Sequence, residues 1–404
     1  MSKPLIPLTI ESPGFLGLNS QKSGSVLPVG WASVMENFIY DNLGRLASRK
    51  GTQQLNGTVV TSSPTIRQSH EYIDVNGTVL NIFAADNKIY KEASGTMTDI
   101  SGTITTPTAD DWQFANFNGW VVGHQADHAP IIMTSTAGSF ADSGGTQHNG
   151  NMVLSAWGRK WTVLANTLYY SDLLIDNMTG GSSGNFDLSK FWPSGMDKAV
   201  ALADFNGYLV VFGENSIIVY ENPDDPTVMT IVEGVDGLGC IARDSVQVVG
   251  KEIMFLSNTG VRTLGRTIQE KSMPITDVSK NVRDELLALV VGETKVRIKS
   301  AYNSKDGFYV LSLPTAGVSF MFDLKFPNED GTLKIGRWSI APTAMHYSNG
   351  NILYTAITAG YLSKYFGYKD EVASDGTGGT AYLIDLEGVW NDFGQEVGPL
   401  VKLL

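Results

Sequence analysis

Leu202-Ala-Asp-Phe-Asn-Gly-Tyr-Leu-Val-Val-Phe-Gly-Glu-Asn-Ser-Ile-Ile-Val-Tyr220 is the clearest copy of the unit from which this chain is built. An apolar stretch leads into Asn206-Gly207, a continuous apolar run follows, and a second turn at Glu214-Asn215 leads into another apolar run. Asn-Gly is favoured in two-residue hairpin turns, where both central residues adopt positive φ. The stretch therefore predicts three antiparallel strands joined by two tight turns.

Six further segments have the same form. The glycines of the seven first turns are Gly77, Gly119, Gly158, Gly207, Gly250, Gly307 and Gly350. A single three-stranded meander cannot bury both of its faces, whereas meanders stacked around an axis bury them. A β-sandwich or a β-solenoid could use the same hairpins, but sandwiches seldom need seven similar units and solenoid repeats are shorter. The sequence therefore predicts an all-β fold, a β-propeller of six or seven blades.

The widest gap between these glycines, from Gly250 to Gly307, contains one predicted helix. It spans residues 279–291, with Ser279 or Asp277 as its cap and apolar residues at helical spacing. Two polar stretches, 134–150 and 179–184, look unable to pack and are predicted to be flexible or ordered by a partner. Loops 134–150, 179–190 and 325–333 are the expected contact regions, because of their length and polarity.

The repeat suggests three regions. Residues 1–60 form an N-terminal arm and first strands that close the propeller or contact neighbours, and residues 61–370 form the propeller. Residues 371–404 form C-terminal strands that could begin a truncated β domain.

Composition narrows the function classes. The net charge of −12 argues against non-specific clamping of DNA, which depends on lysine and arginine. The start has no basic segment followed by an apolar run, and no stretch approaches the length of a membrane span, so no membrane insertion is expected. A single cysteine, Cys240, excludes an internal disulfide and suits a reducing cytosol.

Catalytic and metal-binding patterns are weak throughout the chain. Gly181-Ser-Ser-Gly184 has the wrong spacing for a nucleophile elbow, and no segment matches the aspartate box of sialidase-like propellers. His124 and His128 have the spacing of zinc ligands on a helix, but Gly123 and Pro130 favour polar loop residues. Cys240 has no activating base or cation beside it, which favours an inert thiol. No enzyme activity, cofactor or metal is predicted.

Two basic clusters are the only candidate site residues: Arg45, Arg49 and Lys50, and Lys295, Arg297 and Lys299. The second set alternates along the sequence, which predicts that its three side chains share one strand face. Such a cluster could bind a phosphate or an acidic partner. A solvated edge strand with protective charges is the other interpretation.

An ordered series of segments resembles one known family. It begins with Phe15-Leu-Gly-Leu-Asn-Ser-Gln21, Leu27-Pro-Val-Gly-Trp31, Glu36-Asn-Phe38, Asp41-Asn-Leu-Gly-Arg-Leu46 and Arg49-Lys-Gly51. It continues with Leu168-Tyr-Tyr-Ser-Asp172, Leu209–Tyr220, Gly239-Cys-Ile-Ala-Arg-Asp-Ser245 and Ile253-Met-Phe-Leu-Ser-Asn-Thr-Gly260. The series resembles the tail hub or nozzle proteins of short-tailed bacteriophages, including packaged-DNA stabilisation proteins and tail tubular protein B.

The resemblance implies a propeller-bearing virion protein, assembled in the host cytoplasm into the phage tail. Six copies would form a ring around the DNA channel, retain the packaged DNA and conduct it at ejection without sequence-specific binding. The portal adaptor (head-to-tail connector) would lie above the ring, with fibres, spikes or a needle outside or below. Relatives usually continue past a region like Trp390-Asn-Asp-Phe-Gly394 into a further β domain, so this chain is expected to be a short member or truncated.

Two alternatives remain at this point. One is a β-propeller scaffold that binds proteins as a stable monomer. The other is a carbohydrate-active propeller at the tail tip, which needs clustered carboxylates that the sequence does not offer by spacing.

Overall fold

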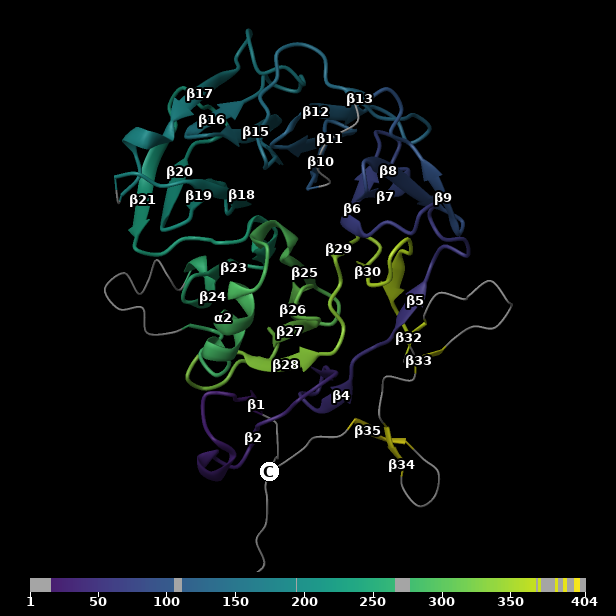
Figure 1. Cartoon of the computed structure of the whole chain (residues 1–404). Helices are drawn as coiled ribbons and strands as arrows, with labels where there is room; N and C mark the ends of the chain where they lie inside the picture. Colours follow the sequence, from purple (N-terminus) through teal and green to yellow (C-terminus); the bar gives the residue numbers. More distant parts are fainter. Residues whose placement is uncertain are drawn as a thin grey trace, which may run out of the picture.

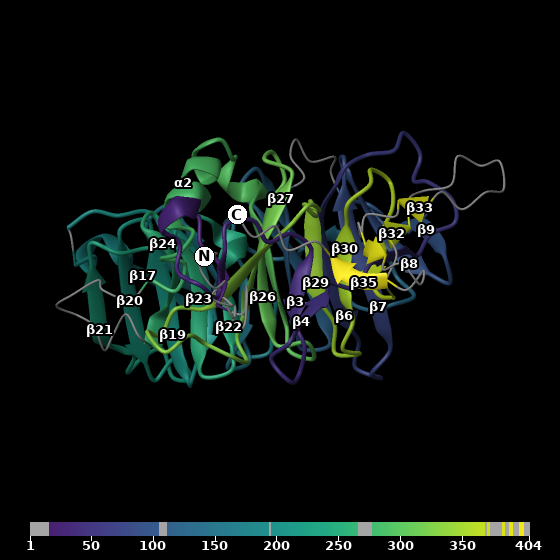
Figure 2. The same ribbon diagram turned by 90° about the horizontal axis from the view of Figure 1, so that it is seen from below.

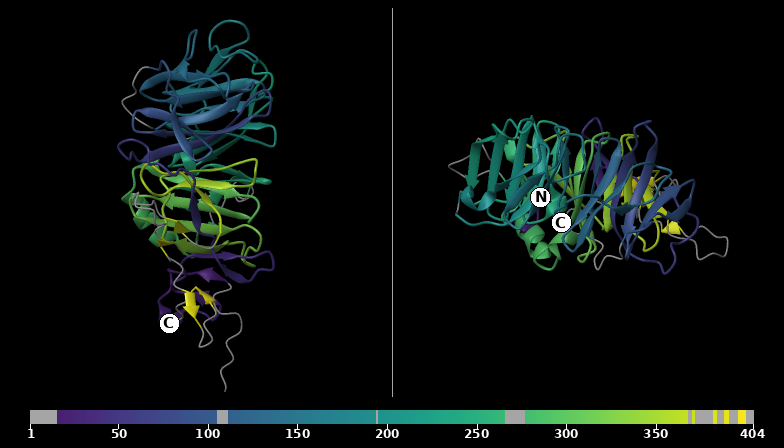
Figure 3. Two further views of the ribbon diagram at one scale, coloured as in Figure 1. Left: turned by 90° about the vertical axis from the view of Figure 1, so that its right-hand side faces the viewer. Right: turned by 90° about the horizontal axis from the view of Figure 1, so that it is seen from above.

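The computed structural model describes residues 16–104, 111–193, 195–265 and 277–367, together with four short strands between residues 370 and 399. Seven antiparallel sheets follow one another along the chain and form the blades of a β-propeller (Figure 1). Seen edge-on, the blades form a flat body whose strands run across its thickness (Figures 2 and 3). The predicted fold class is therefore confirmed, with seven blades.

The first four blades each contain four strands in chain order. The strands are β6 (Ile66–Ile73), β7 (Val79–Ala85), β8 (Lys88–Ala93) and β9 (Thr96–Asp99); β10 (Gln113–Phe117), β11 (Trp120–Gln125), β12 (His128–Met133) and β13 (Ala141–Asp142); β14 (Leu154–Ala156), β15 (Arg159–Leu164), β16 (Thr167–Tyr170) and β17 (Gly184–Asp187); β18 (Ala199–Phe205), β19 (Tyr208–Gly213), β20 (Ser216–Glu221) and β21 (Thr230–Asp236).

The last three blades are less regular: blade 5 has three strands among the described residues, and blade 7 takes its outer strand from the N-terminal region. The strands are β22 (Gln247–Val249), β23 (Glu252–Ser257) and β24 (Gly260–Thr263); β25 (Lys299–Asn303), β26 (Phe308–Leu313), β27 (Val318–Asp323) and β28 (Lys334–Trp338); β29 (Ala344–Tyr347), β30 (Leu353–Ala356), β31 (Ser363–Tyr365) and β5 (Thr52–Gln54). The first strand of each blade contacts the first strand of the next, and β29 contacts β6. The ring is therefore closed, and β5 completes its last blade.

The seven predicted first turns are the first hairpins of the seven blades. Asn206 and Gly207 have φ of 52° and 81°, which explains why Asn-Gly recurs at these turns. At Gly350 the positive φ falls instead on the next residue, Asn351, at 59°.

The hydrophobic core lies between neighbouring blades. In β19, Leu209 and Val211 pack against blade 3, while Val210 and Phe212 pack against blade 5. Successive side chains of a strand point to opposite faces, so a strand buried on both faces needs a continuous apolar run. This explains the uninterrupted apolar segments that the sequence shows.

The polar stretches predicted to be flexible are partly ordered. Residues 134–150 contain β13 and the buried Phe140, and the stretch 179–184 leads directly into β17. The prediction missed these fourth strands because outer strands are short and polar, without an apolar run.

Among the described residues, the α-helix α2 (Arg283–Val291) packs against β24, and the short 3₁₀ turns are η1 (Gly24–Val26), η2 (Leu188–Lys190), η3 (Arg243–Ser245) and η4 (Lys295–Arg297). The predicted helix is confirmed, but it starts at Arg283 rather than at residue 279. Neither Asp277 nor Ser279 caps it. The Ser279 hydroxyl donates to Asp277 and accepts from the backbone N–H of Val261 (2.9 Å), which ties this segment to β24.

The N-terminal strands β1 (Gly17–Leu18), β2 (Trp31–Ala32), β3 (Phe38–Tyr40) and β4 (Leu46–Ser48) lie outside the ring, beside β28 of blade 6 (Figure 1). The indole N–H of Trp338 donates to the carbonyl of Phe38 (2.9 Å). Near the C-terminus, β32 (Asp370–Glu371) pairs with β33 (Tyr382–Leu383), and β34 (Gly388–Trp390) pairs with β35 (Glu396–Pro399). The rest of the predicted C-terminal region, 371–404, lies outside the described residues.

Candidate functional site

Charged side chains gather where the inner strands begin. The first strand of every blade lines the centre of the ring, and these strands run in the same direction, so the segments before them meet at one end of the channel. Asp111, Arg243, Asp244, Arg297 and Lys299 lie there, and we call them the channel-mouth cluster.

Arg243 makes the longest connection in the channel-mouth cluster. It precedes blade 5, yet its guanidinium donates to the carbonyls of Asp111 (3.2 Å) and Trp112 (3.3 Å) before blade 2, and of Asn151 before blade 3. These hydrogen bonds join the segment before blade 5 to the segments before blades 2 and 3, which are not its neighbours in the ring. The middle of the channel mouth is therefore spanned by the protein's own side chain.

Asp244 neutralises the buried cations of the cluster. Its carboxylate accepts from Nε of Arg243 (2.7 Å) and from Nζ of Lys299 (2.5 Å). Burial raises the pKa of Asp244, but the two cations outweigh burial and hold this pKa well below its usual range. Arg297 forms a further ion pair with Asp111 (3.0 Å). The charged groups of the cluster are thus paired with one another and are not available to a ligand that enters the channel.

A smaller cavity of about 230 Å³ adjoins the channel-mouth cluster. Its lining includes Asn151, Lys198, Glu214, Arg243 and Lys295.

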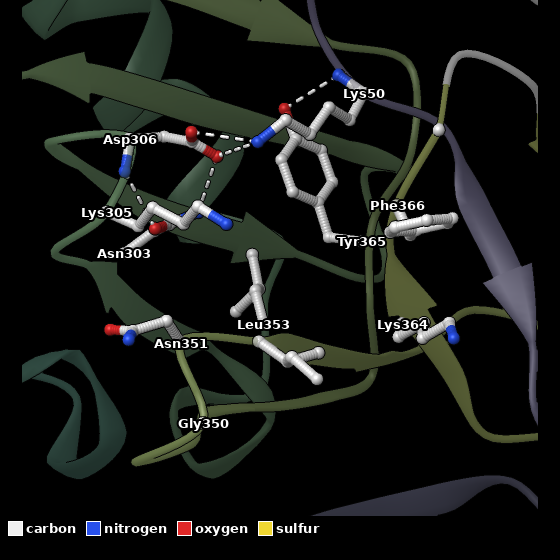
Figure 4. A pocket seen from close by; sticks show the side chains of 12 residues that line it. Lys50, Asn303, Lys305, Asp306, Gly350, Asn351, Leu353, Lys364, Tyr365 and Phe366 are labelled. Atoms are coloured by element: carbon white, nitrogen blue, oxygen red, sulfur yellow. Dashed lines mark hydrogen bonds and ion pairs between the residues drawn. The ribbon is translucent and has the colours of Figure 1, made fainter.

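A second pocket lies between blades 6 and 7, with a volume of about 440 Å³, and we call it the Lys50 pocket (Figure 4). Its walls come from the first turns of both blades, from β31 and from the segment before β5. Its lining residues are Lys50, Asn303, Lys305, Asp306, Gly350, Asn351, Ile352, Leu353, Lys364, Tyr365, Phe366 and Gly367.

An ion pair forms one wall of the Lys50 pocket. Nζ of Lys50 lies 2.8 and 2.7 Å from the two carboxylate oxygens of Asp306, and Asn303 donates to the same carboxylate (3.1 Å). The Tyr365 hydroxyl accepts from the backbone N–H of Lys50 (2.8 Å). Figure 4 shows the Lys50 side chain reaching toward Asp306 beside the Tyr365 ring.

The first predicted basic cluster is not brought together. Arg45 is exposed at a hairpin and pairs with Asp41 (2.8 Å), whereas Arg49 is fully buried and donates to the side-chain oxygen of Asn37 (2.9 Å). Of these three residues, only Lys50 lines the large pocket.

The second predicted cluster does not share one strand face, so that geometric prediction is wrong. Lys295 and Arg297 lie in η4, and only Lys299 belongs to β25. The reason is local: the backbone N–H of Arg297 donates to Thr294 (2.8 Å), and Lys295 donates to Val290 (2.9 Å) near the end of α2. These contacts close a turn where the alternating pattern suggested a strand.

The predicted polar loop at His124 and His128 is also wrong. His124 lies on β11 and is buried, and His128 begins β12, so the connecting turn is only Ala126-Asp127. Among the described residues, no three His, Cys, Asp or Glu side chains gather closely enough to hold a metal ion. Burial raises the pKa of the Cys240 thiol to about 11, which keeps it protonated at neutral pH.

Sequence reasoning missed most of the residues of the channel-mouth cluster and of the Lys50 pocket. Asp306, Lys364 and Tyr365 are far in sequence from Lys50. Arg243 and Asp244 were quoted only as part of a family-like segment. The only available signal was that an Arg-Asp pair sits immediately before an inner strand.

No protein-family model and no curated protein matches the chain. Solved structures give a weak likeness in fold. A computationally designed protein, Ika8, is 14% identical with a TM-score of 0.46, over 78% of this chain and 99% of that chain. Streptogramin B lyase is 14% identical with a TM-score of 0.44, over 78% of this chain and 97% of that chain.

PorZ, a surface component of the type-IX secretion system of Porphyromonas gingivalis, is 13% identical with a TM-score of 0.44, over 80% of this chain and 38% of that chain. These values carry no argument about function. In the part of the chain that the structure describes, no helix is long and apolar enough to cross a membrane.

Proposed function

We propose that this propeller is a structural, non-catalytic protein of a short phage tail, in which copies of the chain, six by the family resemblance, form a ring around the DNA channel. The ring retains packaged DNA and conducts it at ejection. It contacts the portal adaptor above and fibres, spikes or a needle outside or below. The proposal starts from the ordered series of family-like segments between Phe15 and Gly260.

The observation that carries the proposal is the occupied channel mouth. Arg243 crosses it, and Asp244 and Lys299 form a buried ion pair beside it. A duplex therefore has no passage through a single propeller, so conduction of DNA requires a larger hole between several copies. The same ion pairs occupy acids and bases that a catalytic site in the channel would use.

The positions of the family-like segments support a structural role. Glu36-Asn-Phe38 packs on blade 6, and Arg49 is buried beside Asn37. Leu209–Tyr220 and Ile253–Gly260 form central strands of blades 4 and 5. Most residues that carry the resemblance thus build the scaffold, whereas Lys50 lines the Lys50 pocket and Arg243 lines the smaller cavity.

The charge of the chain agrees with a conduit. At a net charge of −12, a ring of copies repels the DNA phosphates on average, which opposes trapping of DNA in transit. Specific contacts with other proteins then hold the ring in place.

Negative-stain electron microscopy of the purified full chain tests this function. We expect ring-shaped particles with six-fold symmetry and a central hole wide enough for duplex DNA. Particles of a single propeller at every concentration, with no ring on addition of a portal–adaptor complex, would contradict the proposal.

A monomeric protein-binding scaffold is the second candidate, and the Lys50 pocket favours it, because the pocket could hold part of a partner without any ring. A carbohydrate-active propeller has less support, since both aspartates of the channel-mouth cluster are paired with cations.

A further inference from the structure

The Lys50 pocket is a basic patch on an acidic chain. Three lysines, Lys50, Lys305 and Lys364, and one aspartate, Asp306, line it, whereas the chain as a whole carries −12. The charges of Lys50 and Asp306 neutralise each other. Two positive charges therefore remain at the pocket, and they attract an anionic group.

The two remaining lysines are available to a ligand. Lys305 is exposed and Lys364 is half-buried, and neither forms an ion pair with any described residue. Nζ of Lys364 lies 4.9 Å from the centre of the Phe366 ring. An ammonium held over an aromatic face is partly stripped of water, which makes its pairing with a carboxylate stronger than that of a fully solvated lysine.

Apolar surface adjoins these charges. Leu353 is buried at the base of the Lys50 pocket, while Phe366 is 59% exposed at its rim. Figure 4 shows the Lys364 and Phe366 side chains on the opposite side of their strand from Leu353 and Tyr365. A ligand that gains from both features needs an anionic group and an apolar group close together.

The wall of the pocket is rigid. The Tyr365 ring stacks on Trp338 at 5.6 Å and meets Phe308 edge-on at 5.9 Å, and its hydroxyl holds the backbone N–H of Lys50. Binding against a wall that is already ordered costs little conformational entropy. The pocket is therefore suited to recognition without rearrangement of the blades.

We infer that the Lys50 pocket binds an acidic peptide segment of a partner protein. One carboxylate of the segment pairs with Lys305, a second pairs with Lys364, and an apolar side chain between them packs on Phe366. A volume of about 440 Å³ accepts a few side chains but excludes a nucleic-acid duplex. This inference rests on the proposed function, since it names the chemistry of one partner of the ring.

A peptide titration tests the inference. The probe is a fluorescently labelled, end-blocked Glu-Phe-Glu peptide, and the readout is fluorescence anisotropy with the full chain. We expect saturable binding that weakens with added salt. The double variant Lys305→Glu/Lys364→Glu should bind at least about tenfold more weakly, because each attraction becomes a repulsion.

The matched control is Lys251→Glu/Lys280→Glu, which makes the same charge change at two exposed lysines outside the pocket. This control should bind within about twofold of the wild type. A neutral variant, Lys305→Met/Lys364→Met, should also lose binding, and it keeps the test valid if charge reversal impairs folding. Phe366→Ala should weaken binding as well.

Equal binding by the wild type and the two pocket variants would overturn the inference. So would an equal loss in the control, or displacement of the peptide by millimolar inorganic phosphate as efficiently as by unlabelled peptide, which would indicate a simple anion site. Failure of the proposed function is distinguishable. A monomer that binds the peptide retains the inference and loses the ring, whereas a ring that does not bind the peptide retains only the function.

Discussion

Asp244 is the residue on which the centre of the ring depends. It pairs with Arg243 from its own turn and with Lys299 from the next blade; both cations are buried, and the Asp244 side chain is only 9% exposed. A charge buried without its partner is costly, whereas exposed ion pairs contribute little. Asp244 therefore stabilises the junction of blades 5 and 6 more than any surface pair does.

Replacement of Asp244 by asparagine should lower the free energy of unfolding by about 3–5 kcal/mol, because two buried cations lose their counter-charge. Urea denaturation followed by fluorescence measures this. The control Lys88→Met removes an exposed ion pair with Asp99 and should cost no more than about 1 kcal/mol. Similar losses of stability in the two variants would mean that the ion pairs of the channel-mouth cluster stabilise the protein no more than an exposed ion pair does.

Asp323 gives a prediction of pH dependence. Burial at the end of β27 raises its pKa to about 6, whereas an unfolded chain returns it to its ordinary value near 4. The folded state therefore binds the proton at higher pH than the unfolded state does. The stability that this group contributes is present at low pH and is lost as the pH rises through 6.

The variant Asp323→Asn cannot ionise, so it escapes this loss. Relative to the wild type, its free energy of unfolding should rise by roughly 1 kcal/mol between pH 5 and pH 8. Urea denaturation at both pH values measures the difference. Asp127→Asn, at an exposed turn, should show no such trend. If the stability of Asp323→Asn relative to the wild type fell between pH 5 and pH 8, burial of Asp323 would not be the cause of its raised pKa.

Side-chain partners were the least predictable feature of the sequence. Lys50 was predicted as part of a basic cluster that the structure does not form, and its partner Asp306 lies 256 residues away, where only the closed ring brings it within reach. Arg49 has the charge pattern of a surface residue and is nevertheless fully buried, because Asn37 accepts its hydrogen bond. Local charge patterns give no information on such distant partners.

At the scale of elements, turns were easier to predict than edges. Asn-Gly turns and continuous apolar runs identified the inner three strands of the blades, since positive φ and burial on both faces restrict the residue types. Outer strands such as β13 have one exposed edge and few apolar residues, so their sequences resemble loops. Their pairing depends on the strand beside them.

The link between β9 and blade 2 is held against the stretch that was predicted to be flexible. A Cβ at Gly102 would lie 2.2 Å from the carbonyl oxygen of Phe140, whereas Gly77 faces open space. Both glycines have positive φ. Gly102→Ala should therefore cost about 1–3 kcal/mol more than Gly77→Ala, in which only the backbone strain is felt. Thermal or urea unfolding of the two variants measures this difference. Equal losses of stability would show that residues 134–150 shift readily to make room for the new methyl group.

The pairing of β5 with β31 closes the ring. The backbone N–H groups of Gly51 and Leu55 donate to the carbonyls of Gly367 and Leu362. Because successive N–H groups of a strand point to opposite sides, the N–H of Gln53 also faces β31. Gln53→Pro removes that donor and should destabilise the protein by about 3 kcal/mol or more. Gln53→Ala keeps the N–H and should be nearly neutral. Hydrogen exchange should show loss of protection throughout blade 7 in the proline variant; unchanged exchange would mean that β5 is dispensable for closure.

At the scale of the whole molecule, the propeller could be predicted because the same unit recurs seven times and only a ring buries all its faces. The occupied channel mouth could not be predicted, because it depends on side chains from three blades, and a backbone carbonyl from a fourth, meeting at one end. That feature agrees with a passage for DNA between several copies and not through one propeller.

The oligomeric mass of the purified full chain tests this central claim most directly. Mass photometry across a range of concentrations should detect a species of six times the mass of one chain. Asp244→Asn should change its stability without changing the number of copies where the variant remains folded. A single species with the mass of one chain at every concentration, also in the presence of a portal–adaptor complex, would contradict the account.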